Sequence, residues 1–352
     1  MRSFVAQAAA LLVIFGLAVF FLASGKFAVL LPTDVLSRAD GSFLAWGTLF
    51  FVLGFFARAL RWKWLFAADA PVKTAEVVAI GFAFFGANLY LPFRLGEALR
   101  PVLFARRGYA SLPTSFGLAL AERVIDMGCA ALILLIGMGA PSVLEGHTAS
   151  FLGLEVDTRL IRKGAFMVSA FSLALCFSLP FFWTQRARLS NLLGRLPKPF
   201  SSVGRKIVEQ LLESLSFLSR ARAVAGFFVT SLVYWGLVVL TMWCLMRAAG
   251  LPANAFQAAL SSGLLVFGLI VPSPPAQAGV HHAASYIALL ACFSSAVVQE
   301  QGAVFVGAFY FLQLLVCGLL GIGAGLYLAR TSNKGRPAGE VPSDPKGAVE
   351  IR

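Results

Sequence analysis

Runs of about 20 consecutive apolar residues recur along this chain, and they restrict what it can fold into. A helix needs about 20 such residues to cross the hydrocarbon core of a bilayer. Six runs reach or approach this length: 4–23, 43–60, 112–139, 164–183, 224–246 and 303–328. Only 13% of the residues are charged, against about 25% in soluble domains. The sequence therefore predicts an integral membrane protein and excludes a soluble globular enzyme.

The run at 4–23 resembles the start of a secreted protein, but it is too long for that role. The apolar core of a secretory signal has about 7–15 residues, whereas this run extends over residues 4–23 without a charge. We expect an uncleaved first span.

Two further apolar stretches end in sequences that are unsuited to a simple crossing. Residues 77–92 run directly into a polar, arginine-rich sequence, and residues 256–271 stop at a Pro-Ser-Pro-Pro sequence before the apolar character resumes. Non-helical backbone at membrane depth is tolerated only where protein buries it or water reaches it. We therefore expect two re-entrant helical hairpins, over 77–107 and 257–298, that enter the membrane from opposite sides.

The positive charges predict the orientation. The chain has 29 Lys and Arg residues against 16 Asp and Glu, and the Lys and Arg residues of membrane proteins gather in cytoplasmic loops. Six spans and two opposed hairpins, with both termini in the cytoplasm, place most of these cations inside, and they place the basic aromatic stretch 58–64 at the level of the lipid headgroups. Eight full crossings are the alternative. The predicted fold class is an all-α polytopic protein of a bacterial cytoplasmic membrane.

Residues 1–330 are predicted to form one membrane domain, and residues 331–352, rich in Gly, Pro and charge, a disordered cytoplasmic tail. A polar insert at 184–223 separates the fourth and fifth spans, and its apolar residues recur at helical spacing among basic ones. We expect a basic amphipathic helix on the inner leaflet. A solvated linker that packs on the bundle is the alternative.

The third span contains three ionisable residues, Glu122, Arg123 and Asp126. Such residues are costly inside a membrane and are therefore candidates for function. Glu122 and Asp126 are four positions apart and share a helix face, and Arg123 is expected to pair with Asp126. An internal ion pair that only fixes helix packing is the alternative.

A second candidate cluster, at the turn of the first hairpin, comprises Asn88, Arg94, Glu97 and Arg100. Two arginines can hold a phosphate through paired hydrogen bonds, so the cluster predicts an anion site. The alternative is that Arg94 and Arg100 are interfacial cations that only set the topology.

The broken helix of the second hairpin, with Pro275, Gly279 and His282, is the third candidate. Prolines leave backbone groups free, and broken helices near the midplane of the membrane form substrate sites in transporters. His281 and His282 point about 100° apart on a helix, so we do not expect them to share a metal ion. No metal or other cofactor is predicted, and the five scattered cysteines indicate neither a zinc site nor a disulfide framework.

Three motifs in this order resemble the family of the transmembrane region of lysylphosphatidylglycerol synthase. They are Arg61-Trp62, the sequence from Asn88 through Pro92-Phe93-Arg94-Leu95-Gly96-Glu97 to Arg100, and Glu122-Arg123-Val124-Ile125-Asp126. The resemblance covers about residues 5–330. In two-part synthases of this family, a soluble aminoacyl-transferase domain makes the lipid and the membrane region is associated with flipping it. The resemblance implies that this chain is the translocating region alone.

A late motif of the family is a Pro-Gly-Gly-type turn followed by Gly and then Glu or His. Here Ala276 and Gln277 replace the two glycines after Pro275, whereas Gly279 and His282 are retained.

We therefore predict a protein that moves an anionic or glycosylated lipid, either a phospholipid or a lipid-linked glycan, between leaflets. Arg94, Arg100 and Arg123 would neutralise the headgroup phosphate, and other side chains would complete the polar path: Glu97, Glu122, Asp126 and His282. One alternative is a membrane enzyme that transfers a glycosyl or acyl group on a lipid carrier, with Glu122, Asp126 and His282 as acid–base groups. Another is an accessory subunit. No nucleic-acid partner is expected. The sequence is compatible with a homo-oligomer.

Overall fold

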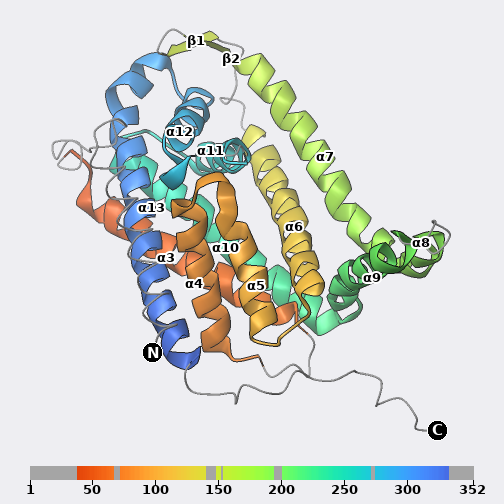
Figure 1. Ribbon diagram of the computed structural model, residues 1–352. Coiled ribbons are helices and arrows are strands. Elements are labelled where there is room, and N and C mark those ends of the chain that lie inside the picture. Colours follow the sequence, from red (N-terminus) through yellow and green to blue (C-terminus); the bar gives the residue numbers. More distant parts are fainter. Residues whose placement is uncertain are drawn as a thin grey trace.

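The computed structural model describes residues 38–66, 72–139, 148–151, 154–193, 200–270 and 274–332. Within these ranges the regular elements are helices, apart from one short β-hairpin (Figure 1). The predicted first span and the predicted tail from residue 333 onward lie outside the described residues.

Five of the predicted spans are present as long helices: α3 (Gly41–Leu60), α6 (Leu112–Met138), α7 (Thr158–Thr184), α10 (Ala221–Ala248) and α13 (Ser295–Ser332). By length and apolar composition, α7, α10, α13 and the segment Gly41–Trp64 that contains α3 are able to cross a membrane. Helix α6 has 27 residues and is therefore about 40 Å long. It differs in carrying Glu122, Arg123 and Asp126, which must face protein or water rather than lipid.

From Ala165 onward the outer surface of α7 is largely apolar. This helix lies along α6 (Figure 1), and its exposed side chains include Leu160, Phe166, Met167, Phe171 and Phe177. A continuous apolar surface of this kind is unfavourable in water, and it is the surface that a lipid-facing helix requires. The chain is accordingly a multi-pass membrane protein.

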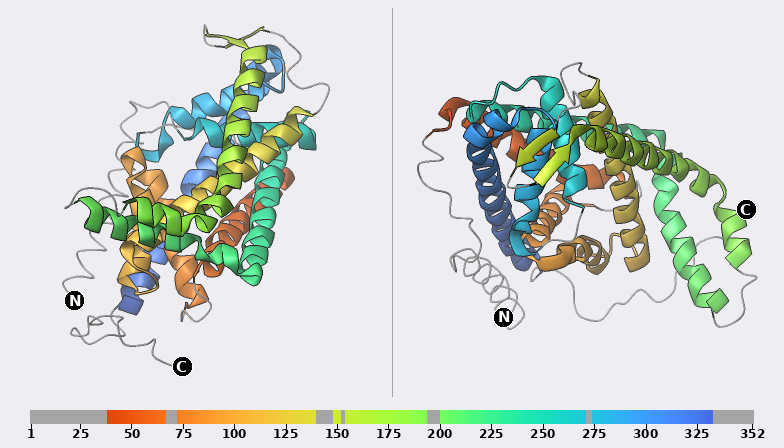
Figure 2. Two further views of the ribbon diagram at one scale, coloured as in Figure 1. Left: turned by 90° about the vertical axis from the view of Figure 1, so that its right-hand side faces the viewer. Right: turned by 90° about the horizontal axis from the view of Figure 1, so that it is seen from above.

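Each of the two segments predicted as a re-entrant hairpin contains a pair of short helices joined by a turn. The first consists of α4 (Thr74–Tyr90), the turn η2 (Pro92–Ala98) and α5 (Leu99–Arg106), and the second of α11 (Ala255–Gly268), the turn η4 (Pro275–Gln277) and α12 (Val280–Leu290). The ends of each hairpin lie together. Arg107 Nη1 is 3.3 Å from Glu76 Oε1, and Gln257 Nε2 donates to the Cys292 carbonyl at 3.2 Å. Each hairpin thus returns to the end of the bundle where it began, and Figures 1 and 2 show the two at opposite ends.

The two turns share an unusual backbone conformation. Each has a proline followed by two non-glycine residues with positive φ, Phe93 and Arg94 (52° and 57°) in the first and Ala276 and Gln277 (59° and 55°) in the second. This conformation costs a residue with a Cβ about 1–2 kcal/mol. The two turns also contact each other, and Arg94 Nη2 donates to the carbonyl of Leu269, at the end of α11, at 2.5 Å.

The order of the elements repeats along the chain. Helices α3, α4, α5 and α6 are matched, after α7 to α9, by α10, α11, α12 and α13, with a strained turn in each hairpin. The packing repeats too, because α4 lies against α13, α11 lies against α6, and α3 lies against α10. The buried apolar side chains form two clusters, one around each hairpin.

Helices α3 and α10, which correspond in this repeat, run antiparallel. Gly47 lies against Leu245, and Gly54 lies against Leu237. Equivalent helices that pair in opposite directions are related by a pseudo-two-fold axis, as in the inverted repeats of many transporters. The described chain therefore contains an inverted repeat that sequence periodicity did not reveal.

Glycines allow the first hairpin to pack closely. A Cβ added at Gly86 of α4 would lie 3.0 Å from the Cα of Gly321 in α13. A Cβ added at Gly96 would lie 2.2 Å from the backbone nitrogen of Asn88. Backbone therefore meets backbone at both positions.

The polar insert forms α8 (Arg186–Leu193), α9 (Phe200–Glu213) and the 3₁₀ helix η3 (Ser214–Ser219). Leu215 and Phe217 of η3 are buried, and Ser214 lies against Gly117 of α6, so this part packs on the bundle as the alternative interpretation predicted. Ile207 of α9 is exposed, which leaves an apolar side chain available to a leaflet.

A short antiparallel β-hairpin, β1 (Thr148–Phe151) and β2 (Leu154–Asp157), connects α6 to α7. The all-α prediction did not include it. Four-residue strands are too short to give a clear alternating pattern.

Candidate functional site

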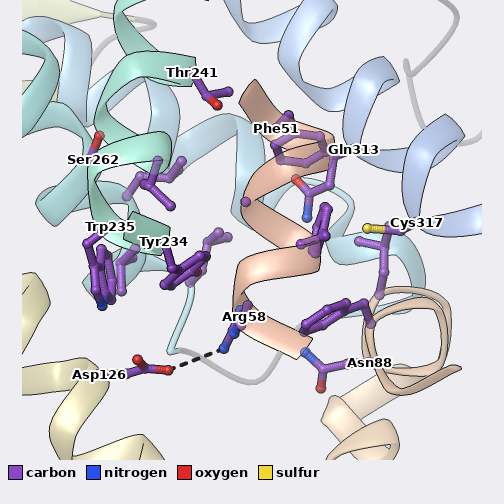
Figure 3. Close-up of a pocket in the computed structure, with 18 of the residues that line it drawn as sticks. Phe51, Arg58, Asn88, Asp126, Tyr234, Trp235, Thr241, Ser262, Gln313 and Cys317 are labelled. Carbon is purple, nitrogen blue, oxygen red and sulfur yellow. Dashed lines mark ion pairs between the residues drawn. The ribbon is translucent and has the colours of Figure 1, made fainter. Parts of the chain in front are cut away.

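A cavity of about 370 Å³ lies between the hairpin turns and the helices α3, α6, α10 and α13 (Figure 3). Much of its wall is aromatic or aliphatic. Its polar lining consists of Arg58, Asn88, Arg94, Glu97, Arg123, Asp126, Tyr234, Thr241, Ser262, Gln277 and Gln313. A mostly apolar cavity with a few convergent polar groups is the usual form of a ligand site.

Beside the cavity, four buried ionisable side chains form an ion network: Arg61, Arg100, Glu122 and Asp126. Arg61 donates to both oxygens of Asp126, at 2.5 and 2.9 Å, and to Glu122 at 2.6 Å. Arg100 of α5 binds the other oxygen of Glu122. Arg61 and Glu122 are 0% exposed. Buried charges are tolerated when they are paired and hydrogen-bonded, and here each carboxylate is bound by at least one arginine.

Aromatic rings hold the buried arginines in place. The guanidinium of Arg100 lies between Trp62 and Phe84, at 4.1 and 4.2 Å from the ring centroids, and that of Arg61 lies 5.2 Å from the ring of Phe227. Cation–π contacts are strongest where water is absent. Arg61 and Trp62 of the basic aromatic stretch are buried among protein side chains, so they do not face the lipid headgroups directly.

Three further arginines, Arg58, Arg94 and Arg123, line the cavity itself. Arg58 Nη2 is 3.5 Å from Asp126 Oδ2, while Arg123 and Arg94 donate to Glu97 Oε1 at 3.0 and 3.3 Å. The predicted pairing of Arg123 with Asp126 is wrong. The described neighbours of Asp126 are Arg61 and Arg58, and Arg123 turns to Glu97 instead.

Sequence reasoning missed Arg58 and Arg61 as members of the site because both were assigned to the membrane surface. A signal was present, however. The third span has two carboxylates and one arginine, and a buried acid without a partner is too costly to persist. Another cation had to reach Glu122 or Asp126.

Several polar atoms of side chains that line the cavity have no hydrogen-bond partner within the described residues: Nε of Arg58, Nε of Arg94, Oδ1 of Asn88, Nε1 of Trp235 and Oγ1 of Thr241. Buried polar groups normally have a partner, so such atoms indicate a place for water or a ligand. Similar partnerless atoms also lie away from the cavity, among them Nε of Arg61 and Nε1 of Trp62, so the cavity holds only part of this set.

The other predicted site residues do not line the cavity: Arg100, Glu122, Pro275, Gly279 and His282. Arg100 and Glu122 are sealed in the ion network. His282 packs against Tyr310, with ring centroids 4.7 Å apart. In the second turn Gln277, and not Gly279, lines the cavity.

The acids of the site are bound by arginines rather than free for a metal ion. Among the residues that the structure describes, no three His, Cys, Asp or Glu side chains are grouped as metal ligands. The arrangement is suited to an anion, because guanidinium groups and amides are its dominant hydrogen-bond donors.

The sequence model of the family described as "Lysylphosphatidylglycerol synthase TM region" matches residues 7–321. The chain belongs to this family. The matched residues include both hairpins, the ion network and the cavity. The family match and the site described above therefore cover the same part of the chain. Membership associates the chain with lipid synthesis or translocation. No curated protein and no solved structure matches it.

Proposed function

We propose that this protein moves a lipid with an anionic headgroup, a phospholipid or a lipid-linked glycan, between the leaflets of a bacterial cytoplasmic membrane. The observation that carries the proposal is the cavity between the two hairpin turns, which combines an apolar wall with an excess of positive charge. We further propose that the hairpins are re-entrant and that six spans surround them.

The charge balance favours an anionic ligand. The ion network and the cavity lining together contain five arginines and three carboxylates: Arg58, Arg61, Arg94, Arg100 and Arg123 against Glu97, Glu122 and Asp126. Two positive charges remain in excess. A lipid phosphate supplies negative charge and accepts paired hydrogen bonds from guanidinium groups.

The arrangement of the hairpins favours transport. A charged group at the centre of a bilayer costs about 2.5–3.5 kcal/mol on insertion scales, so a headgroup needs a polar lining to cross. Two hairpins that enter from opposite sides and meet at Arg94 and Leu269 supply polar groups near mid-depth. The inverted repeat supports the same class, because many transporters are built from such repeats around a central site.

Group transfer, the enzymatic alternative, has less support. General acid–base catalysis requires a group that reaches the substrate and exchanges a proton with it. Both oxygens of Glu122 are bound by arginines, as are both oxygens of Asp126. His282 does not line the cavity.

Reconstitution tests the proposal. The purified full chain is placed in vesicles that contain phospholipids labelled on an acyl chain, with phosphatidylglycerol, phosphatidic acid or phosphatidylcholine headgroups, and dithionite is added outside. We expect the quenched fraction of the anionic labels to rise from about half toward completeness. Quenching equal to that of protein-free vesicles for the anionic lipids would refute the proposal.

A further inference from the structure

The cavity has a second end that carries no charge. Figure 3 shows Arg58 and Asp126 at one end of the cavity and Thr241 and Ser262 toward the other. The ring of Tyr234 lies 5.3 Å from the guanidinium carbon of Arg58, and Thr241 follows Tyr234 by seven positions, or about 10 Å along α10. Thr241 therefore lies roughly one headgroup's length from Arg58, while Gln277 lies in the turn η4, which contacts the turn that carries Arg94.

The uncharged end is rich in hydroxyl and amide groups. Thr241 is 3% exposed, and its hydroxyl has no partner among the described residues. Ser262 is 1% exposed and donates to the Ala258 carbonyl at 2.7 Å, so its oxygen can still accept. Gln313 Nε2 donates to Gln277 Oε1 at 3.2 Å. Hydroxyls and amides both donate and accept, which is what a ligand hydroxyl needs.

Gln277 occupies a position that favours glycine. Its φ is 55°, a conformation that is strained for any residue with a Cβ. Strained residues concentrate where their side chains serve a site, and the Gln277 side chain lines the cavity and binds Gln313. A glycine at this position would relieve the strain and remove the amide.

We infer that the cavity binds a lipid phosphate at its arginines and an uncharged polyol, a glycerol or sugar headgroup, at Thr241, Ser262, Gln277 and Gln313. The inference rests on the function proposed above for the same site. It also disfavours headgroups that carry an additional ammonium. The carboxylates in the described lining are Glu97 and Asp126, and both are already paired with arginines. An aminoacyl ester would therefore find no free negative charge.

A binding measurement tests this separately from transport. The purified full chain in detergent is titrated with short-chain phosphatidylinositol, phosphatidylglycerol, phosphatidic acid and lysylphosphatidylglycerol, and thermal stabilisation gives each Kd. We expect phosphatidylinositol or phosphatidylglycerol to bind at least about fivefold more tightly than phosphatidic acid, as buried hydrogen bonds allow. Tighter binding of phosphatidylinositol would indicate a site for a sugar-like ring, and tighter binding of phosphatidylglycerol a site for glycerol. Lysylphosphatidylglycerol is expected to bind more weakly than phosphatidylglycerol.

Matched threonine variants locate the effect. Thr241→Val is expected to lower the preference for the polyol lipid over phosphatidic acid by about fivefold. Thr230→Val, on the same helix and outside the cavity lining, is expected to leave it unchanged. Equal affinities in the unmodified protein, no lipid binding at all, or a preference that Thr241→Val does not alter would overturn the inference. Selective binding without lipid movement in vesicles would support the polyol site and refute translocation. Lipid movement without selective binding would support translocation and refute the polyol site.

Discussion

Arg61 and Asp126 bind each other through two hydrogen bonds, at 2.5 and 2.9 Å, although 65 residues separate them in the chain. The pair ties the end of α3 to the middle of α6, and Arg61 also reaches Glu122. The site therefore depends on a contact between two helices that are distant in sequence. Of the arginines at the cavity, Arg58 contacts this pair directly, with its Nη2 3.5 Å from Asp126 Oδ2.

Removing Arg61 is expected to destabilise the protein strongly. Arg61→Met leaves Glu122 and Asp126 with fewer positive partners, and breaking a buried ion pair costs about 3–5 kcal/mol. The fraction of monodisperse protein that survives heating in detergent measures the effect. Lys63→Met, at an exposed position on the same 3₁₀ turn, is the control and should behave like the unmodified protein. If the Arg61→Met variant were as heat-resistant as the Lys63→Met variant, the buried ion network would not stabilise the protein as expected.

Removing Arg58 is expected to slow lipid movement rather than unfold the protein. Asp126 keeps Arg61 as a partner in Arg58→Gln, whereas the headgroup loses a charged donor worth about 1.5–3 kcal/mol. We expect the rate for phosphatidic acid in vesicles to fall at least about tenfold. Arg247→Gln, an exposed arginine at the end of α10, should retain the original rate. Equal rates in the two variants would exclude Arg58 from the transport path.

Ala276 and Ala278 should respond to glycine in opposite directions. Ala276 has a φ of 59°, and relief of about 1–2 kcal/mol of left-handed strain outweighs the added freedom of the unfolded chain, about 0.5–1 kcal/mol. Ala278, with a φ of −56°, has no such strain to lose. Ala276→Gly should raise the melting temperature in detergent and Ala278→Gly should lower it. A lower melting temperature for Ala276→Gly would show that its methyl group matters more than its backbone.

Cysteine labelling tests the orientation of the hairpins. A maleimide that does not cross membranes should label Arg106→Cys only after cells are permeabilised, and should label Pro252→Cys in intact cells; both positions are exposed. The unmodified chain, with its five native cysteines, gives the background. Eight full crossings would reverse both results, because the first hairpin would deliver Arg106 to the outer side.

Tyr109, in the loop before α6, predicts a pH dependence at alkaline pH. Burial and its hydrogen bond to Glu76, at 2.5 Å, raise the pKa of Tyr109 to about 12. The folded protein therefore retains this proton between pH 10 and 12 while the unfolded chain loses it, so the tyrosine's contribution to stability is lost as pH rises through that window. Tyr109→Phe should show a smaller fall in melting temperature over the same range. Identical profiles would exclude this contribution.

Much of the fold followed from local sequence. The helical run predicted at 112–139 corresponds to α6 at Leu112–Met138, because a helix satisfies its backbone hydrogen bonds within one segment. Both hairpins were predicted where prolines and polar residues interrupt apolar runs. Their antiparallel repeat was not, because equivalent helices pack alike without having similar sequences.

The residues of the site were predicted better than their partners. Glu122 and Asp126 share a face, as their spacing requires, and both contact Arg61. The partner of Arg123 was mistaken, because a spacing of three positions permits an ion pair with Asp126 but does not exclude stronger competitors from α3.

By itself the sequence determined which segments are apolar enough to be membrane helices, where two of them break, and that charges lie inside the third span. These are local properties, set by run length, proline and the cost of charge in lipid. Tertiary structure alone decided that Arg58 and Arg61 complete the network, that the turns meet at Arg94 and Leu269, and that one cavity has a charged and an uncharged end. Those outcomes depend on which helices pack together. Helix packing joins residues that are far apart in the sequence, so local sequence patterns do not specify it.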